Sequence, residues 1–342
     1  MFDLDDVDSK SVKTFASKIN KHNILGAIRL NPGTTRQKLS AKLSLSPSLI
    51  NIYINELIRD HWINVTERSG NTVGRKTESL AVSPHQTLFI CILVKPDGIV
   101  AHLNNLQGTT LRFFEYAWPI PENQPDYLHS LSQSLNTLSK ETDLQTNEMA
   151  GVVVFDGPVI NPHFHVLQIR GLKEWVPLSL KNLLQRALPF QIMVLSQSHA
   201  IINFYRYQQR LTDFIYLDLT GPMAIGVVQC NVITQGHIGT AGELSHASLD
   251  PQGLPCICSG TGCLETLDSP AQRWEMLNDR LLSRLVRKYH PLDLLVNLGP
   301  GPEGVSFPNR GGLGIRPVLP EGADILAGAY HSVVQAFIQA KI

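Results

Sequence analysis

The feature that most constrains the fold is a compact group of cysteines and one histidine within Ala241–Ser269, a stretch that reads AGELSHASLDPQGLPCICSGTGCLETLDS. Cys256, Cys258 and Cys263 fall within eight residues. His246 lies ten residues before the first of them. Three thiolates and one imidazole form the closed tetrahedral ligand set that zinc takes in structural sites.

The spacing of this group suits a tight loop. Pro255, Ser259, Gly260 and Gly262 favour a backbone that folds back on itself, so ligands a few residues apart can converge on one ion. The sequence therefore predicts one structural zinc ion. The expected ligands are His246, Cys256, Cys258 and Cys263. The alternative is a set of reduced thiols in a glycine-rich turn.

The charges are unevenly distributed along the chain. Its 342 residues are enough for two or three domains, and 29 basic residues balance 29 acidic ones. Between Lys10 and Lys76, however, twelve basic side chains stand against three acidic ones, a net charge of +9. A short acidic leader, Asp3–Asp8, precedes this stretch. A basic module joined to a mildly acidic body predicts a partner with phosphates at one end only.

No apolar run reaches the length of a membrane span, and no basic, apolar leader opens the chain. Five cysteines, three of them better explained by a metal than by disulfides, agree with a reducing compartment. We therefore expect a cytoplasmic protein.

The N-terminal stretch has the order of a winged helix-turn-helix. Helical spacing or helix-start signals predict helices over Lys10–Leu30, from Thr35 to about Leu43, and from Pro47 to about Asp60. Two short strands, Trp62–Val65 and Glu78–Val82, flank a polar loop. In this motif the third helix enters the DNA major groove. A three-helix packing module without nucleic acid is the alternative.

The outer face of the third helix carries no Lys or Arg between Pro47 and Ile58, so base reading falls to Ser48, Asn51 and Asn55. Ser46, the expected N-cap, belongs to the same surface. Phosphate contacts are expected from basic side chains in the second helix and in the loop between the strands. These are Arg36, Lys38, Lys42, Arg75 and Lys76. The loop pair suits a narrow, A·T-rich minor groove.

After Pro84 the pattern changes to alternating strands and helices, which indicates an α/β body with sites at strand ends. The expected strands are Leu88–Val94, Ile99–Leu103, Leu111–Tyr116, Ala150–Phe155, Ile192–Leu195, Phe214–Leu219, Ala224–Val232 and Leu294–Asn297. The expected helices are Leu128–Lys140, Pro177–Ala187, His199–Gln209, Gln272–Tyr289 and Ala323–Ala340. Gly299–Gly314 is expected to be a loop.

A winged helix-turn-helix followed by Ala-Gly-Glu-Leu-Ser-His and Cys-Ile-Cys-x4-Cys-Leu-Glu resembles the ROK family of repressors, open reading frames and kinases, and within it the NagC/Mlc/XylR-type repressors. The match is strongest over Asn20–Pro84 and Asn231–Ser269. The resemblance implies an α/β fold with a winged helix-turn-helix in residues 1–82. A two-lobed, actin-like ATPase fold, with a sugar cleft and the oligomer contacts, is expected in residues 83–342.

In this family the Glu and His of the first motif, and the Glu that follows the last cysteine, bind hexose hydroxyls. Carried over, the sugar-binding residues are Glu243, His246 and Glu265. The histidine then presents one nitrogen to zinc and the other to the cleft. The alternative for the two glutamates is a helix-end or surface carboxylate. The tail is several dozen residues shorter than the family pattern, so helices that cover the cleft or build the dimer are expected to be absent.

The departures from the kinase pattern favour a regulator over an enzyme. Where family kinases have an Asp-Gly-Gly-Thr-type phosphate loop, this chain has Cys91–Gly98. Ser198 stands at the position of the carboxylate that accepts the proton of the sugar hydroxyl, and a serine cannot serve as that base. We therefore expect no catalytic residues.

The resulting hypothesis is a repressor of sugar uptake or metabolism genes that binds an A·T-rich, palindromic operator as a homodimer or tetramer. Its effector is expected to be a sugar, a sugar phosphate or a phosphotransferase-system protein. The alternatives are a sugar kinase with an accessory DNA-binding head, and a degenerate paralogue that acts through protein partners.

Overall fold

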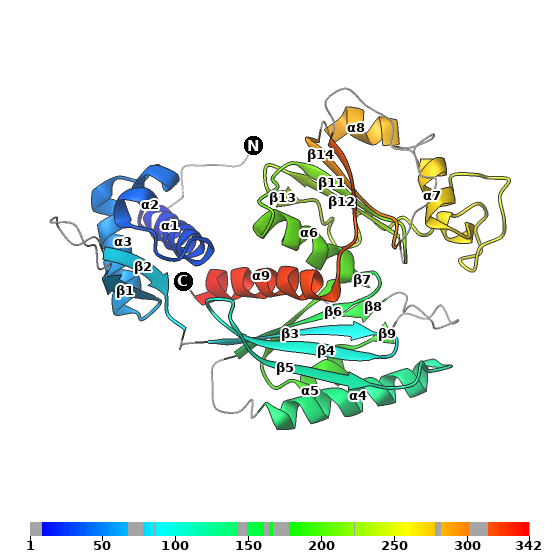
Figure 1. The fold of residues 1–342 in the computed structure, drawn as a ribbon, viewed down its shortest axis with the longest axis horizontal. Coiled ribbons are helices and arrows are strands. Elements are labelled where there is room, and N and C mark those ends of the chain that lie inside the picture. The colour runs from blue at the N-terminus through cyan, green and yellow to red at the C-terminus, as the bar shows by residue number, and fades with distance from the viewer. Residues whose placement is uncertain are drawn as a thin grey trace.

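The computed structural model describes residues 9–67, 78–84, 87–142, 149–160, 164–166, 178–221, 223–277, 282–289, 291–300 and 314–341. Figure 1 shows a small N-terminal module beside two lobes, each built around a twisted sheet. None of the helices in these ranges is both long and apolar enough to cross a membrane.

The N-terminal module is a winged helix-turn-helix, as predicted. It consists of α1 (Ser9–Leu30), α2 (Arg36–Leu43), α3 (Pro47–Arg59), β1 (Ile63–Glu67) and β2 (Glu78–Val82). Thr35 and Ser46 cap α2 and α3, because each side chain accepts a hydrogen bond from a backbone N–H of the first turn. The strands pair antiparallel, with Ile63 opposite Val82. The loop with Arg75 and Lys76 lies outside the described residues.

The module shares its core with the rest of the chain. Ile24 and Ile28 of α1 and Ile54 of α3 are fully buried and belong to the same apolar cluster as residues of the last helix, α9 (Gly322–Lys341). The ring of Trp62 lies 6.1 Å from that of Phe337 in α9. The module is therefore packed onto the body, not tethered to it.

The first lobe has a five-stranded sheet in the order β10-β6-β3-β4-β5. Its strands are β3 (Leu88–Lys95), β4 (Gly98–Asn105), β5 (Thr110–Ala117), β6 (Met149–Phe155) and β10 (Gln191–Ser196). Phe89, Cys91 and Leu93 pack toward α9, whereas alternate residues such as Ile90 pack toward α4 (Gln124–Glu141) and α5 (Lys181–Ala187). Both faces are covered, which explains the unbroken apolar run of β3.

One predicted helix of this lobe begins later than expected. Leu178–Ser179, placed in a helix by the sequence, form strand β9, which pairs with β8 (His165–Val166). β8 also pairs with β7 (Val159–Ile160). The N–H of Leu180 donates to the carbonyl of Phe164, so α5 begins only at Lys181.

The second lobe has a sheet in the order β13-β12-β11-β14-β15. Its strands are β11 (Phe214–Asp218), β12 (Ala224–Gln229), β13 (Val232–Ile233), β14 (Asp293–Asn297) and β15 (Gly314–Val318). The single strand predicted over Ala224–Val232 is wrong, because Cys230 and Asn231 take φ values of 49° and 63° and turn the chain into a hairpin. Strand β15 was not predicted.

The helices of this lobe are α6 (Gln197–Tyr207), α7 (Pro270–Leu277) and α8 (Ser283–Tyr289), with a short 3-10 turn, η1 (Leu264–Thr266). The sequence predicts one helix from Gln272 to Tyr289. The structure describes α7 and α8 there, and residues 278–281 between them lie outside the described part.

Helices α6 and α9 lie between the two sheets (Figure 1). They approach closely at Gly328, where an added Cβ would lie 1.8 Å from the carbonyl oxygen of Ala200. The amide of Asn203 donates to the hydroxyl of Ser332 at 2.7 Å across the same contact. The two lobes therefore pack together through α6 and α9.

Candidate nucleic-acid interface, metal centre and cleft

The exposed face of α3 carries the predicted base-reading residues. Ser48, Asn51 and Asn55 are exposed, while Ile50 and Ile54 on the opposite face are fully buried. The hydroxyl of Ser46 accepts from the N–H of Leu49 at 3.3 Å and keeps its own proton to donate.

Arg36 is not an isolated phosphate anchor. Its Nη1 donates to Oδ1 of Asn51 at 3.2 Å and its Nη2 donates to Oδ1 of Asn55 at 3.0 Å. Its Nε lies 3.5 Å from a carboxylate oxygen of Glu78 in β2. Arg36 therefore joins the start of α2 to the outer face of α3 and to the wing strand.

The other two described basic candidates lie elsewhere on the module. Lys38 and Lys42, one turn apart on α2, line a hollow of about 290 Å³ with the turn Asn31–Thr34. Both side chains are exposed, which suits contact with a phosphate backbone.

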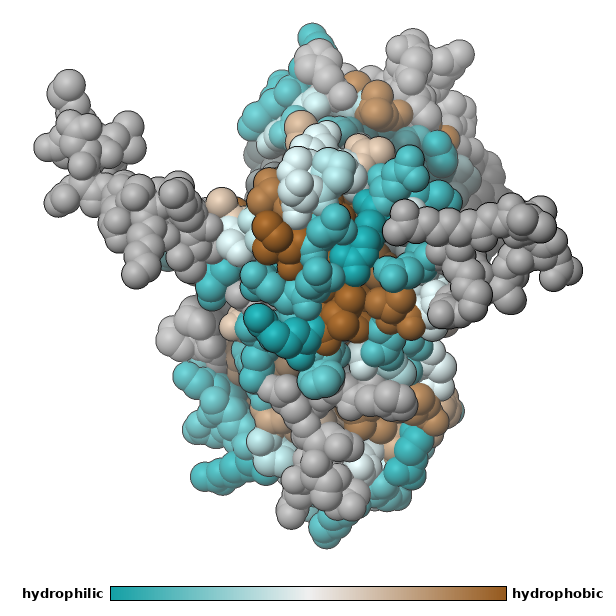
Figure 2. All heavy atoms as spheres, turned by 90° about the vertical axis from the view of Figure 1, so that its left-hand side faces the viewer, coloured by the Kyte–Doolittle hydropathy of each residue, from teal (hydrophilic) through white to brown (hydrophobic). Residues whose placement is uncertain are grey.

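This side of the molecule is mixed in character. Figure 2, which faces the N-terminal module, shows a mostly hydrophilic surface with hydrophobic patches between. Leu49 and Ile52 of α3 are 39% and 52% exposed. Apolar side chains at these positions can contact thymine methyl groups in a major groove.

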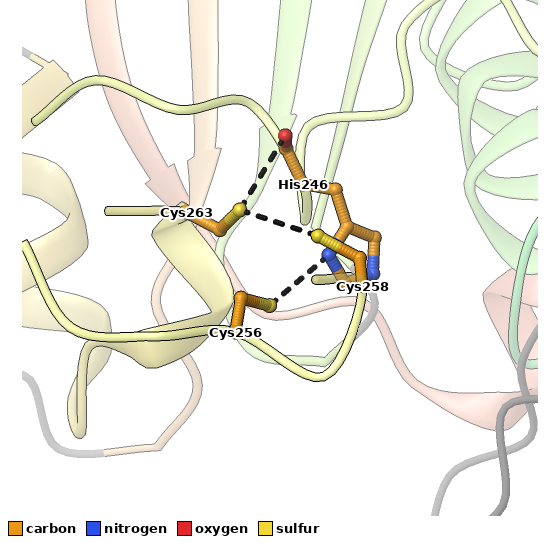
Figure 3. A group of neighbouring side chains, drawn as sticks. All are labelled: His246, Cys256, Cys258 and Cys263. Carbon is orange, nitrogen blue, oxygen red and sulfur yellow. Dashed lines mark hydrogen bonds between the residues drawn. The ribbon is translucent and has the colours of Figure 1, made fainter. Parts of the chain in front are cut away.

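The four metal-ligand candidates converge on one point (Figure 3). One ligand atom each from His246, Cys256, Cys258 and Cys263 lies within 4.8 Å of the other three. Nδ1 of His246 is 3.4 Å from Sγ of Cys256, and Sγ of Cys258 is 3.6 Å from Sγ of Cys263. Around a tetrahedral zinc ion with Zn–S bonds of about 2.3 Å, ligand atoms lie ~3.5–3.8 Å apart. The group fits zinc.

Two glycines make this convergence possible. Gly262 takes a φ of +64°, and a Cβ there would lie 1.6 Å from the carbonyl oxygen of Asp250. A Cβ on Gly260 would lie 3.3 Å from Sγ of Cys258. The N–H of Cys256 donates to the carbonyl of Gly260 at 2.8 Å and closes the turn.

The thiols differ in acidity. A backbone hydrogen bond at Gly260 lowers the pKa of Cys258, whereas burial raises the pKa of Cys263 to about 12. Binding of a divalent cation requires all three as thiolates, so metal binding would release protons.

The three predicted sugar residues are Glu243, His246 and Glu265. Glu243 lines a narrow cleft between the lobes with Asp156, Ser198 and Asp218, and burial raises its pKa to about 7. Glu265 follows the last cysteine, and its carboxylate is close enough to raise the pKa of His246, which burial lowers. Among the described residues, Oε2 of Glu265 is buried without a hydrogen-bond partner.

The segment at the position of the kinase phosphate loop is a closed hairpin. Lys95 pairs with Gly98, which leaves Pro96 and Asp97 as a two-residue turn. The indole and backbone N–H groups of Trp118 donate to the carbonyls of Pro96 and Asp97, each at 2.9 Å. Pro96 has no N–H, so this turn presents fewer backbone donors to a phosphate than a glycine-rich loop of the same length.

The sequence patterns did not reveal a buried basic group between the module and α9. Nη1 of Arg29 lies 2.9 Å from Nδ1 of His331, and both residues border a cavity of about 360 Å³. The sequence does contain a signal for the burial of Arg29. His22, Leu25 and Arg29 are spaced by three and four residues, which places Arg29 on the buried face of its helix.

The chain matches two family models. The model described as "ROK family" covers residues 90–274, more than half of the chain, and that described as "Winged helix-turn-helix DNA-binding" covers residues 18–64.

Among curated proteins, the chain is 23% identical over 260 residues to a xylose repressor of Caldicellulosiruptor bescii, across 75% of this chain and 65% of that protein. It is 21% identical over 269 residues to the DNA-binding transcriptional dual regulator NagC of Escherichia coli, across 76% of this chain and 64% of that protein. The chain therefore spans about two thirds of the length of these relatives, or slightly less.

Among solved structures, a ROK family transcriptional regulator that is a homologue of the E. coli MLC protein superposes with a TM-score of 0.69 at 18% identity, covering 95% of this chain and 97% of that one. A ROK family glucokinase from Streptomyces griseus superposes with a TM-score of 0.54 at 17% identity, covering 72% and 99%. These similarities establish the fold, an N-terminal winged helix-turn-helix and a two-lobed α/β body.

Proposed function

Because the chain belongs to the ROK family, we propose that it is a DNA-binding transcriptional regulator, acting in the cytoplasm as a repressor of sugar uptake or metabolism genes. The observation that carries this proposal is the exposed face of α3, where Asn51 and Asn55 lie beside Arg36 in a stretch with a net charge of +9. A module built on residues 1–82 reads the operator, and residues 83–342 sense the effector and form the oligomer.

The hydrogen bonds of Arg36 define what the two asparagines can read. A guanidinium only donates, so Oδ1 of Asn51 and of Asn55 faces Arg36 and each Nδ2 faces outward. Two outward donors match the acceptors of the major groove, namely O6 and N7 of guanine, N7 of adenine and O4 of thymine. Ser46, Ser48, Lys38 and Lys42 add hydrogen bonds and positive charge around them.

A sugar or sugar phosphate is the proposed effector of the inter-lobe cleft, with Glu243, His246 and Glu265 as its contacts. A zinc ion held by His246, Cys256, Cys258 and Cys263 would fix the loop and orient the histidine. A ligand that binds between the lobes would change how α6 and α9 pack. It would thereby shift the spacing of the two DNA-binding modules in a homodimer or tetramer on a palindromic operator.

Two features support a regulator over a kinase. Ser198 lines the cleft and stands at the position where family kinases carry the carboxylate base. The closed Pro96-Asp97 turn occupies the position of the phosphate loop. A carboxylate base and a phosphate cradle are the two parts that phosphoryl transfer to a sugar hydroxyl requires.

The test is genomic pull-down with the full chain, followed by gel-shift assays on the recovered sites at two salt concentrations. We expect a palindromic consensus bound with a higher affinity than random DNA at the same salt. Binding that is salt-sensitive but has no sequence preference would contradict the proposal. ADP release with common hexoses and amino sugars would instead support the kinase alternative.

A further inference from the structure

A second cavity, separate from the inter-lobe cleft, lies where the N-terminal module meets the body. Its volume is about 360 Å³, within the range of small-molecule sites. α1 supplies Arg29, the β4–β5 turn supplies Gln107, and α9 supplies Tyr330 and His331. Figure 1 shows α1 beside the C-terminal end of α9, and the cavity extends from there along the first half of α9, between Ala323 and His331.

Arg29 is a buried cation with no counter-ion in the part of the chain that the structure describes. It is 5% exposed, and none of the ion pairs formed by the described residues includes it. Its Nη1 is 2.9 Å from Nδ1 of His331, whereas Nε and Nη2 have no hydrogen-bond partner among the described residues. A buried charge without an opposite charge and full hydrogen bonding costs several kcal/mol in general. Such a group is rarely kept without a partner.

The surroundings of Arg29 are neutral. Burial, together with the charge of Arg29, lowers the pKa of His331 to about 3, so its Nδ1 accepts from the guanidinium. Burial also lowers the pKa of His102, which lines the same cavity. No Asp or Glu belongs to the described lining. The described lining of the cavity therefore carries one positive charge and no negative charge.

The two free nitrogens of Arg29 form one recognition edge. Nε–H and Nη2–H point in the same direction from a guanidinium, and this edge binds phosphate or carboxylate in a bidentate manner. The ring of Tyr330 lies 5.6 Å from the guanidinium carbon and covers its face. No described protein atom accepts from this edge, but both nitrogens are covered from solvent, so an anion reaches them only by displacing the side chains that cover them.

We infer that this cavity is an effector site for a small anionic metabolite, which binds Arg29 through a phosphate or carboxylate group. The neutral polar side chains of Asn104, Gln107 and Thr110 line the same cavity and suit the hydroxyl groups of such a molecule. This site shares no lining residue with the cleft of Glu243, so it stands whether or not the cleft binds a sugar.

Helix α1 connects this site to the DNA-binding face on α3. Nζ of Lys21, two turns before Arg29 on α1, lies 2.6 Å from a carboxylate oxygen of Glu56 on α3. A ligand that draws Arg29 toward α9 moves α1, and α1 carries α3 with it. This coupling rests on the proposed DNA-binding function, whereas ligand binding itself does not.

The test is a thermal-shift and calorimetric titration of the full chain, without DNA, with inorganic phosphate, glucose 6-phosphate, gluconate and glucose. The wild type is compared with Arg29→Met and with Arg316→Gln, which removes an exposed arginine of β15. We expect a saturable rise in melting temperature with at least one anionic probe, in the wild type and in Arg316→Gln only. Arg29→Met removes an unbalanced buried charge but also leaves Nδ1 of His331 without its donor, so each ligand-induced shift is measured from the variant's own ligand-free melting temperature.

Inorganic phosphate and glucose 6-phosphate carry a phosphate group, whereas gluconate carries a carboxylate. Comparison of these probes therefore shows which of the two groups the site binds. Thr110→Val, at the cavity wall, provides a second variant that should weaken the response without altering Arg29. Equal shifts in the wild type and Arg29→Met, or no shift with any anionic probe at millimolar concentration, would overturn the inference. Operator binding measured on the same preparations shows separately whether the DNA-binding proposal holds.

Discussion

The contact between α6 and α9 at Gly328 allows a sharp prediction. In Gly328→Ala the new methyl group would lie 1.8 Å from the carbonyl oxygen of Ala200 and 2.8 Å from the backbone nitrogen of Phe204. These atoms belong to a helix backbone and cannot rotate away. Carbon–oxygen contacts normally exceed about 3.3 Å, so the helices must separate by about 1.5 Å.

Two effects oppose each other in this variant. Alanine favours a helix over glycine by up to ~1 kcal/mol. Overpacking costs about 1–3 kcal/mol, and the separation also weakens the 2.7 Å bond between Asn203 and Ser332, a loss of about 1 kcal/mol. Because the clash is with backbone, the cost lies at the upper end of its range. We expect a net loss of about 2–3 kcal/mol in the free energy of unfolding.

Gly26→Ala in α1 is the matched control. Its added Cβ meets only Nε2 of Gln335, at 3.8 Å, which is an ordinary contact. This variant should gain up to ~1 kcal/mol from helix propensity alone. Urea unfolding of both variants, followed by circular dichroism, should move the midpoints in opposite directions. A Gly328→Ala midpoint at or above that of the wild type would refute the reasoning.

Three further predictions concern the metal centre, the DNA-binding face and the cleft. The chain purified without chelator should contain one zinc ion, and the Cys258→Ser variant should lose it. Elemental analysis that finds no zinc in the wild type would contradict the predicted metal site. Asn51→Ala should weaken operator binding by about 1–3 kcal/mol. Lys38→Gln should reduce the slope of log affinity against log salt concentration by about one, the value expected for one lost phosphate contact. Gel shifts at several salt concentrations measure both effects. Burial raises the pKa of Glu243 from 4.5 to about 7, so the folded protein retains a proton that the unfolded chain releases, and stability falls as pH rises through this interval. Glu243→Gln should remove this part of the pH dependence, up to about 3 kcal/mol, and an unchanged profile of melting temperature against pH would show that Glu243 is not its source.

Local signals were sufficient for the module and the metal loop. Thr35 and the Ser46-Pro47 pair fix the starts of α2 and α3 by contacts within one turn. His246 and the three cysteines fall in one loop, so spacing alone identified the cluster. The family resemblance added the two-lobed body, which the family model and the fold confirm.

Features that depend on distant partners were not visible in the sequence. β15 is held by pairing with β14, and the Cys230-Asn231 turn lies inside an apolar run that resembles one strand. Arg29 and His331 are 302 positions apart, so no spacing rule relates them. The hydrogen bonds of Arg36 with Asn51 and Asn55 form only once α2 and α3 have packed, so the sequence did not predict them.

The shared core of the N-terminal module and α9 limits how this chain can be recombined. Trp62 packs against Phe337, and the buried side chains of α1 belong to the same cluster as those of α9. A head domain cut out at residue 82 would leave this apolar surface open to water, and a head grafted from another regulator would meet a body surface shaped for a different neighbour. Exchange of DNA specificity between such proteins is therefore expected to succeed through substitutions on the outer face of α3 more readily than through transfer of whole heads.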